Sequence, residues 1–134
     1  MPASNAAGSL VSATTQEKEL QLPYILSTAW IVPGKSERLR AWYQELEDRR
    51  DETLQTLDNE GIRQEVAFIL PTEHGELLAV FIEVEDMAKA DEAFYSSPYE
   101  IDHQHRQVMD ECTVGGATGR VPAELMYAFQ NPPT

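Results

Sequence analysis

Two of the three histidines of the chain stand one residue apart in the stretch SSPYEIDHQHR, residues 96–106. Histidine side chains bind transition metals and exchange protons near neutral pH, so His103 and His105 are candidates for a metal site or an acid–base site. On a strand the two rings would share one face and could bind one metal ion, whereas on a helix they lie about 200° apart. The secondary structure of this stretch therefore decides its chemistry.

The residues that precede the histidines are typical of a helix N-terminus. Ser97 is a good N-cap, Pro98 suits the first helical position, and Glu100 stands three residues after the serine, as in a capping box. Asp102 offers an alternative cap slightly later. Either start places both histidines within a helix. We therefore expect no metal ion shared by the two rings, and the sequence indicates no cofactor.

His105 shares one apolar face of this helix with Ile101, Val108 and Cys112. We expect His105 to point into the protein and His103 to face solvent. Two interpretations of His105 remain open. It is either a half-buried histidine hydrogen-bonded to a backbone carbonyl, or a group in a cavity that binds a ligand or acts as a general acid or base. The second interpretation makes His105 the candidate catalytic residue.

Arg50 is a second irregularity. It falls near the centre of a helical stripe of otherwise mostly apolar side chains, which consists of Leu39, Tyr43, Leu46, Thr53 and Leu57. An arginine there needs a carboxylate or a bound anion as its partner, unless its methylene groups lie along the stripe and its guanidinium reaches water. We take Arg50 and His105, with the aromatic residues Tyr43 and Trp30, as candidate ligand-binding residues.

Composition limits the class of protein and its partners. The 134 residues carry 10 Lys and Arg against 23 Asp and Glu, a net charge of −13, which repels nucleic acid and anionic membrane surfaces. A single cysteine cannot form an internal disulfide, and we expect a cytoplasmic protein without a signal peptide or membrane span. Residues 1–20 lack a periodic apolar signal and are expected to form a disordered tail. One domain is expected at residues 21–131.

The periodicity of apolar residues predicts the elements that position the candidate site. Strands are expected at residues 22–32, 62–70, 76–85 and 120–130, and helices at residues 35–60, 86–97 and 98–114. The stretch GGATG, residues 115–119, is expected to be a loop after the last helix. The order is that of a ferredoxin-like β-α-β-β-α-β sandwich of the α+β class, with the second helical region split in two.

Both faces of the predicted strand at residues 76–85 are apolar. Its side chains alternate between a face with Leu78, Val80, Ile82 and Val84 and a face with Leu77, Ala79 and Phe81. Helices cover only one face of a ferredoxin-like sheet, so the other face needs a partner. We expect a second copy of the same sheet, which gives a homodimer in the form of a dimeric α/β barrel.

Residues 25–113 resemble a family of small, uncharacterised bacterial proteins of the dimeric α/β-barrel type. The most recognisable motifs are RRDETLQTLDNEG and an Ile-Asp pair followed by a histidine, here Ile101, Asp102 and His105. More remotely, EGIRQEVAFIL and LLAVFIEVEDMAKADEAF are similar to the middle of the sugar (L-rhamnose) mutarotases. That resemblance implies a catalytic histidine on the first helix, but residues 35–60 contain no histidine.

These observations leave three hypotheses for a protein of unknown biochemical function. The first is a dimeric α/β-barrel protein that binds a small molecule such as a sugar, a quinone or a small acid in a cavity between sheet and helices. The second is a cofactor-independent isomerase, similar to a mutarotase, or a monooxygenase, with His105 as the proton carrier. The third is a structural or interaction protein whose interior is filled by side chains. Fold alone does not choose among them.

Overall fold

The computed structural model describes residues 23–133. Within this part of the chain the elements are β1 (Tyr24–Ile31), α2 (Ser36–Asp48), α3 (Arg50–Asn59), β2 (Ile62–Thr72), β3 (Gly75–Val84), α4 (Met87–Tyr95), α5 (Glu100–Cys112) and β4 (Thr113–Ala123). The helix predicted around the histidine pair is confirmed as α5. The tail expected at residues 1–20 lies outside the described residues, and one domain at residues 21–131 stays a prediction.

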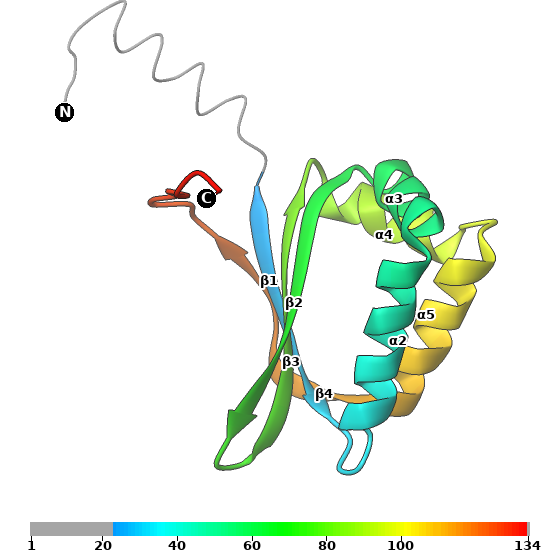
Figure 1. Cartoon of the computed structure of the whole chain (residues 1–134), viewed down its shortest axis with the longest axis vertical. Helices are drawn as coiled ribbons and strands as arrows, with labels where there is room; N and C mark the ends of the chain where they lie inside the picture. The colour runs from blue at the N-terminus through cyan, green and yellow to red at the C-terminus, as the bar shows by residue number, and fades with distance from the viewer. Residues whose placement is uncertain (1–22, 134) are drawn as a thin grey trace, which may run out of the picture.

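The four strands form one antiparallel sheet in the order β2-β3-β1-β4. The helices lie together on one side of this sheet, and within residues 23–133 no helix covers the other side (Figure 1). Strand order and layering are those of the ferredoxin-like fold, so the predicted α+β class is confirmed. The strands β2 and β4 form the edges, and β3 and β1 lie in the middle.

The helix predicted at residues 35–60 is divided at Arg49. There the backbone leaves the helical conformation, with φ of −94° and ψ of 49°. The Thr53 hydroxyl donates a hydrogen bond of 2.7 Å to the carbonyl of Leu46, close to the break. This bond gives a partner to a carbonyl at the end of α2, where such oxygens lack a partner within the helix.

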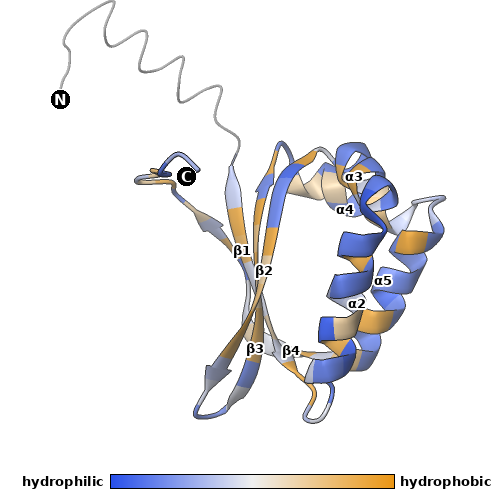
Figure 2. Cartoon of the chain, in the orientation of Figure 1, coloured by the Kyte–Doolittle hydropathy of each residue, from blue (hydrophilic) through white to orange (hydrophobic). Residues whose placement is uncertain are grey.

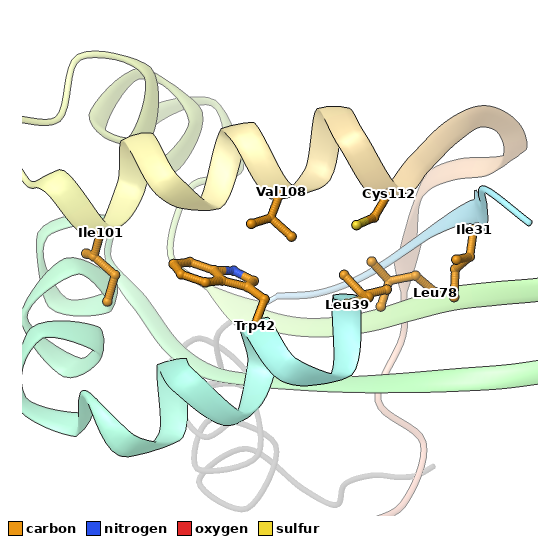
Figure 3. Close-up of a cluster of buried hydrophobic side chains, with 7 residues drawn as sticks. All are labelled: Ile31, Leu39, Trp42, Leu78, Ile101, Val108 and Cys112. Carbon is orange, nitrogen blue, oxygen red and sulfur yellow. The ribbon is translucent and has the colours of Figure 1, made fainter. Parts of the chain in front are cut away.

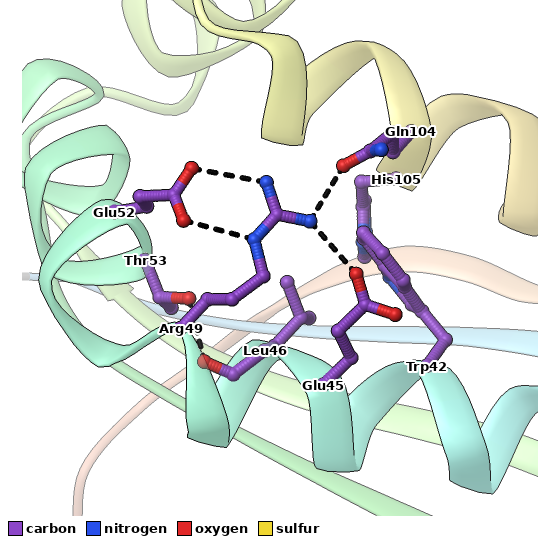
Figure 4. Close-up of polar contacts among 8 residues, drawn as sticks. All are labelled: Trp42, Glu45, Leu46, Arg49, Glu52, Thr53, Gln104 and His105. Carbon is purple, nitrogen blue, oxygen red and sulfur yellow. Dashed lines mark hydrogen bonds and ion pairs between the residues drawn. The ribbon is translucent and has the colours of Figure 1, made fainter.

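Because of this break, Arg49 and not Arg50 points toward the rest of the protein. Arg49 is half-buried and donates to Glu45 and Glu52 on the two sides of the break, and to Gln104 of α5 (Figure 4). Arg50 is exposed. Its exposure fits the alternative in which the guanidinium of Arg50 reaches water, and it lines a hollow together with Leu46 and Leu57 of the stripe. A role of Arg50 in ligand binding stays a prediction.

The last strand begins earlier than expected. The sequence predicted a loop at residues 115–119 and a strand at residues 120–130, but the glycine-rich stretch lies within β4, where Gly119 pairs with Thr28 of β1 and residues 115–118 fall at an irregularity. The register shifts between Thr28 and Trp30, which interrupts the regular ladder. Glycine adopts the backbone conformations that such an irregularity requires, and Gly116 has a φ of 96°.

The main core lies between α2, α5 and the sheet (Figure 3). Its buried side chains are Ile31, Leu39, Trp42, Leu78, Ile101, Val108 and Cys112. Burial of each large apolar side chain contributes roughly 1.5–3 kcal/mol to stability. A smaller cluster is made of Ile82, Val84 and Ala90, where α4 meets the sheet. Together the two clusters hold the helices on the sheet.

The side of the sheet that faces away from the helices is apolar and open. Along it, Phe81 of β3 pairs with Leu26 of β1 and with Val66 of β2. Its exposed large hydrophobic side chains are Val66, Phe68, Leu70, Phe81, Val114 and Val121. In Figure 2 the strands carry much of the hydrophobic colour, and the helices present mostly hydrophilic residues. We call this surface the open sheet face.

The segment after β4 adds to the apolar surface. Residues 124–133 have no regular secondary structure and lie on the side of the sheet opposite to the helices (Figure 1). The exposed hydrophobic side chains of this segment are Leu125, Met126, Tyr127 and Phe129. A monomeric protein rarely exposes contiguous apolar surface of this kind, so a partner surface is expected here.

Candidate functional site

A cavity of about 400 Å³ lies between the helices and the helix-facing side of the sheet. Residues of both core clusters supply part of its apolar lining, among them Leu78, Ile82 and Ile101. The ionisable side chains that line it are Tyr43, Glu60, Glu65, Asp91, Tyr95, Asp102, His105, Arg106, Asp110 and Arg120. The interior is therefore not filled by side chains, and ionisable groups from every layer of the fold reach the cavity.

The indole ring of Trp42 forms a hydrogen bond with His105. The Nε1–H of Trp42 donates a hydrogen bond of 2.8 Å to Nδ1 of His105, and Figure 4 shows the two rings together. An indole N–H can only donate, so Nδ1 must accept and the neutral ring carries its proton on Nε2. Burial lowers the pKa of His105 to about 4, although the nearby charge of Asp102 acts in the opposite direction. The cavity therefore contains a neutral imidazole with a defined tautomer.

Asp102 lies one helical turn before His105 on α5, and it is only 3% exposed. The hydroxyl of Thr56 on α3 donates to its carboxylate at 2.5 Å, within a buried pair. A carboxylate buried without such a donor would be costly, so Thr56 stabilises the charge and joins α3 to α5.

Glu60 is the second buried carboxyl group, with 8% of its surface exposed. It ends α3, where the helix dipole disfavours negative charge. Burial, followed by the charges of Asp102 and Glu65, raises the pKa of Glu60 to about 8. Thr56 lies nearby, but the single proton of its hydroxyl is used by Asp102. At pH 7 the Glu60 carboxyl is therefore mostly protonated.

Glu65 brings a third carboxyl group to the cavity, from the edge strand β2. It faces the helices because it pairs with Ile82 of β3, whose side chain is in the core. Burial raises the pKa of Glu65 above its usual range. The ring of Tyr43 on α2 lies near this wall, and burial followed by the charge of Glu65 raises the pKa of its hydroxyl. The phenol therefore stays protonated.

The arginines of the cavity lining are already engaged. Arg120 of β4 pairs with Asp91 of α4 at 2.5 Å. Arg106 donates to the carbonyl of Phe94 at 3.1 Å, and its guanidinium lies 5.6 Å from the centre of the Phe94 ring. Arg106 also contacts Nδ1 of His103 at 2.6 Å, so the half-buried His103 has a different environment from His105. Neither arginine is bonded to Glu60, Glu65 or Asp102.

The structure brings together two of the four residues that the sequence analysis selected as ligand-binding. Tyr43 and His105 line the same cavity, and their rings meet edge to face with centroids 6.2 Å apart. Arg50 lines a second hollow of about 680 Å³, between α2, α3 and the edge strand β2. Trp30 lines neither, because β1 places it in register with Leu77 on the open sheet face.

The sequence analysis did not select the three carboxyl groups. Glu60, Glu65 and Asp102 resemble surface residues in a chain with 23 acidic side chains. One signal was available, since Asp102 belongs to the Ile-Asp and histidine motif of the family resemblance. Glu60 and Glu65 are recognisable only from the fold, which brings the end of α3 and the start of β2 to the same cavity as α5.

We expect Trp42→Phe to raise the pKa of His105 from about 4 toward the value of a free imidazole. Phenylalanine keeps most of the burial but removes the N–H that holds Nδ1 unprotonated, so part of the shift should be lost. An NMR titration of the imidazole signals measures this change, with His74 and His103 as internal references. An unchanged His105 titration would show that burial alone keeps the ring neutral.

The described residues contain no group of three His, Cys, Asp or Glu side chains placed to hold a metal ion. Among residues 23–133 no helix is long and apolar enough to cross a membrane. The cavity lining presents carboxyl groups, a neutral imidazole, two guanidinium groups, hydroxyl groups and aromatic rings.

Comparison with known proteins gives a fold neighbour and a family. The tetracenomycin F2 cyclase from Streptomyces glaucescens, a type-II polyketide cyclase, has a similar solved structure, with a TM-score of 0.50 and 17% identity over 81% of this chain and 98% of that chain. At this identity the likeness shows the fold alone. No curated protein matches the sequence. The model of a family of unknown function, DUF6176, matches residues 23–134, and the chain therefore belongs to that family.

Proposed function

We propose that this protein is a homodimer that binds a small organic molecule in the cavity between its sheet and its helices. The observation that carries the proposal is the cavity itself, which is lined by the buried carboxyl group of Glu60, a group without an ion-pair partner among the described residues. Buried polar groups without partners are rare in proteins and are typical of ligand sites. A ligand that hydrogen-bonds to Glu60 would satisfy it.

The cavity is large enough for such a ligand. Small-molecule sites usually measure about 300–1,000 Å³, and this one measures about 400 Å³. At about 30 Å³ for each water of the liquid, that volume corresponds to roughly a dozen waters. A monosaccharide or a two-ring aromatic compound fits within this volume. The fold neighbour, a polyketide cyclase, supports the idea that this architecture accommodates a ring-containing organic molecule.

A specific observation favours acid–base catalysis as a second candidate function. The cavity holds one group whose pKa is raised to about 8, Glu60, and one whose pKa is lowered to about 4, His105. Groups with pKa values moved apart in this way are typical of a general acid and a general base. They suit a cofactor-independent isomerisation or cyclisation, in which one proton is added to the substrate and another is removed. The remote resemblance to sugar mutarotases is compatible with this chemistry.

The homodimer part of the proposal rests on the open sheet face. Six large hydrophobic side chains are exposed there, and residues 124–133 carry four more on the same side of the sheet. A second copy offers a surface of the same shape and polarity, which a two-fold axis can bring into contact. The helices and the cavity lie on the other side of the sheet, so dimerisation leaves the cavity open to its ligand.

Binding can be tested with three compounds that share an indole ring but differ in charge: tryptamine, indole-3-ethanol and indole-3-acetate. We expect at least one of them to shift the NMR signals of Tyr43 and His105 in a saturable way. Ala29→Phe should abolish this effect, because Ala29 lines the cavity and a phenyl ring there fills it.

Ala41→Phe is the matched control, since Ala41 is exposed on α2 and does not line the cavity. It should bind like the wild type. The proposed function fails if none of the three compounds binds at millimolar concentration, or if Ala29→Phe binds them as well as the wild type does.

A further inference from the structure

We propose that the cavity selects a ligand with a positively charged amine, which Glu60, Glu65 and Asp102 hold together. This inference rests on the proposed binding function and adds the chemical class of the ligand. The three carboxyl groups come from three elements, the end of α3, the edge strand β2 and α5, and all of them line the one cavity. Among the described residues, no three such groups are placed to hold a metal ion together.

The three carboxyl groups have no positive partner in the protein. Within residues 23–133, none of the ion pairs includes Glu60, Glu65 or Asp102. Burial without a cation costs free energy for a charged carboxylate. The site therefore lacks a positively charged group that could balance these carboxyl groups when they ionise.

The bases that line the cavity cannot supply that charge without giving up bonds they already make. Arg50 lines the neighbouring hollow together with Glu65 and is exposed to solvent. Arg120 is paired with Asp91, and Arg106 is bonded to the Phe94 carbonyl. Arg49 is bound by Glu45 and Glu52. His105 accepts from Trp42 at Nδ1 and is neutral. A cation must therefore come with the ligand.

Glu60 is the group that should respond most to such a ligand. The residue is more than nine-tenths buried and lines the cavity, and the nearby hydroxyl of Thr56 donates its hydrogen bond to Asp102. The charged groups that act on it are acidic: Asp102 of α5, Glu65 of β2 and Asp91 of α4. Asp91 is already neutralised by Arg120. An ammonium group in the cavity would stabilise the ionised form of Glu60 against all of these effects.

Binding of a positively charged ligand should release a proton from Glu60. Because burial raises the pKa of Glu60 to about 8, the free protein holds a proton there at pH 7, and binding of a cation should release it. The affinity for a cation should then rise with pH up to about 8 and level off above it. The affinity for an uncharged ligand should not follow this course, since it leaves the proton in place.

The same three indole compounds test the inference by calorimetry. At pH 8.5 we expect tryptamine to bind at least tenfold more tightly than indole-3-ethanol, which corresponds to one charge-assisted hydrogen bond. Indole-3-acetate should bind most weakly. Between pH 8 and pH 6 the affinity for tryptamine should fall by up to about tenfold per pH unit. Titrations in buffers of different ionisation enthalpy should show release of one proton on binding at pH 7.

Glu60→Gln keeps the shape and hydrogen bonding of the side chain without its charge. It should remove the preference for tryptamine over indole-3-ethanol. Glu73→Gln is the control, because Glu73 is exposed in the turn between β2 and β3 and lies outside the cavity. That variant should keep the wild-type preference and its pH dependence.

The outcomes separate the inference from the function on which it rests. Tight binding of indole-3-ethanol or indole-3-acetate in the cavity, without a preference for tryptamine, overturns the cationic ligand but supports the binding function. Absence of binding by all three compounds counts against both. If Glu60→Gln does not fold, the proton count with the wild-type protein decides. Tryptamine binding without proton release at pH 7 contradicts the inference.

Discussion

Light scattering of the Phe81→Glu variant is expected to give the mass of one chain, and wild-type protein at micromolar concentration the mass of two. Phe81 is 41% exposed at the middle of the open sheet face, in register with Leu26 on one side and Val66 on the other. If a second sheet covers this face, a glutamate there would be buried without a partner. That burial costs several kcal/mol on each side of a two-fold axis, which is enough to separate the subunits.

Gln107→Glu is the matched control for charge. Gln107 is exposed on α5, in the helical layer on the other side of the sheet, so its substitution adds the same charge without touching the open sheet face. It should leave the two-chain mass unchanged. A wild-type mass of one chain would refute the homodimer, and a two-chain mass for Phe81→Glu would show that the contact lies elsewhere.

Circular dichroism distinguishes dissociation from unfolding in this experiment. The main core, with Trp42 and Ile101, lies on the helix side of the sheet and does not include Phe81. We therefore expect Phe81→Glu to keep its secondary structure as a monomer. Its stability should be lower than that of the wild type, since association stabilises the folded state in proportion to the protein concentration.

The fold was predictable because its signals are local. Alternation along residues 76–85 and helical spacing along residues 98–114 identify a strand and a helix without knowledge of their neighbours. The exposed face of Phe81 follows from the same alternation, since the helices of such a fold cover only one side of its sheet. These predictions depend on the regular spacing of apolar residues, which can be seen in a single sequence.

The break at Arg49 was not predictable in the same way. The sequence around it, EDRRDE, contains neither glycine nor proline and is compatible with a continuous helix. The contact that accompanies the break joins Arg49 to Gln104, 55 residues further along the chain. Likewise the glycines of β4 indicate a loop by propensity, and the pairing of residues 113–114 and 119–123 with β1 keeps this stretch within the strand.

The candidate site likewise has residues that the sequence predicts and residues that it does not. His105 was recognisable as a polar residue on an apolar helix face, and the structure gives it a donor, Trp42, that no local pattern indicates. Acidic residues are usually solvated, so sequence reasoning assigned Glu60 and Asp102 no role inside the protein. Their burial depends on the packing of α3 against α5, which joins Thr56 to Asp102 across 46 residues. Long-range packing of this kind has no periodic signature.

Glu60→Gln is expected to change how stability depends on pH. In the unfolded chain a glutamate titrates near 4.5, whereas in the folded protein burial raises the pKa of Glu60 to about 8. Between these values the folded state holds a proton that the unfolded chain has released. Stability of the wild type should therefore decrease as pH rises through this window, by up to about 1.4 kcal/mol per pH unit from this group. Glutamine does not titrate, so the variant lacks this loss.

The difference between the two proteins isolates Glu60 from the other titrating groups. His105 acts in the opposite direction, because its pKa is lowered to about 4 in the folded state, and its contribution is lost as pH falls from about 6.5 to 4. That contribution is common to both proteins and cancels in their difference.

Denaturant unfolding at one fixed protein concentration should show Glu60→Gln gaining roughly 2–5 kcal/mol of unfolding free energy relative to the wild type between pH 5 and pH 8. The exposed Glu73→Gln should show no such gain. A difference between Glu60→Gln and wild type that stays constant across this range would mean that Glu60 titrates alike in the folded and unfolded states, and would contradict a raised pKa for this group.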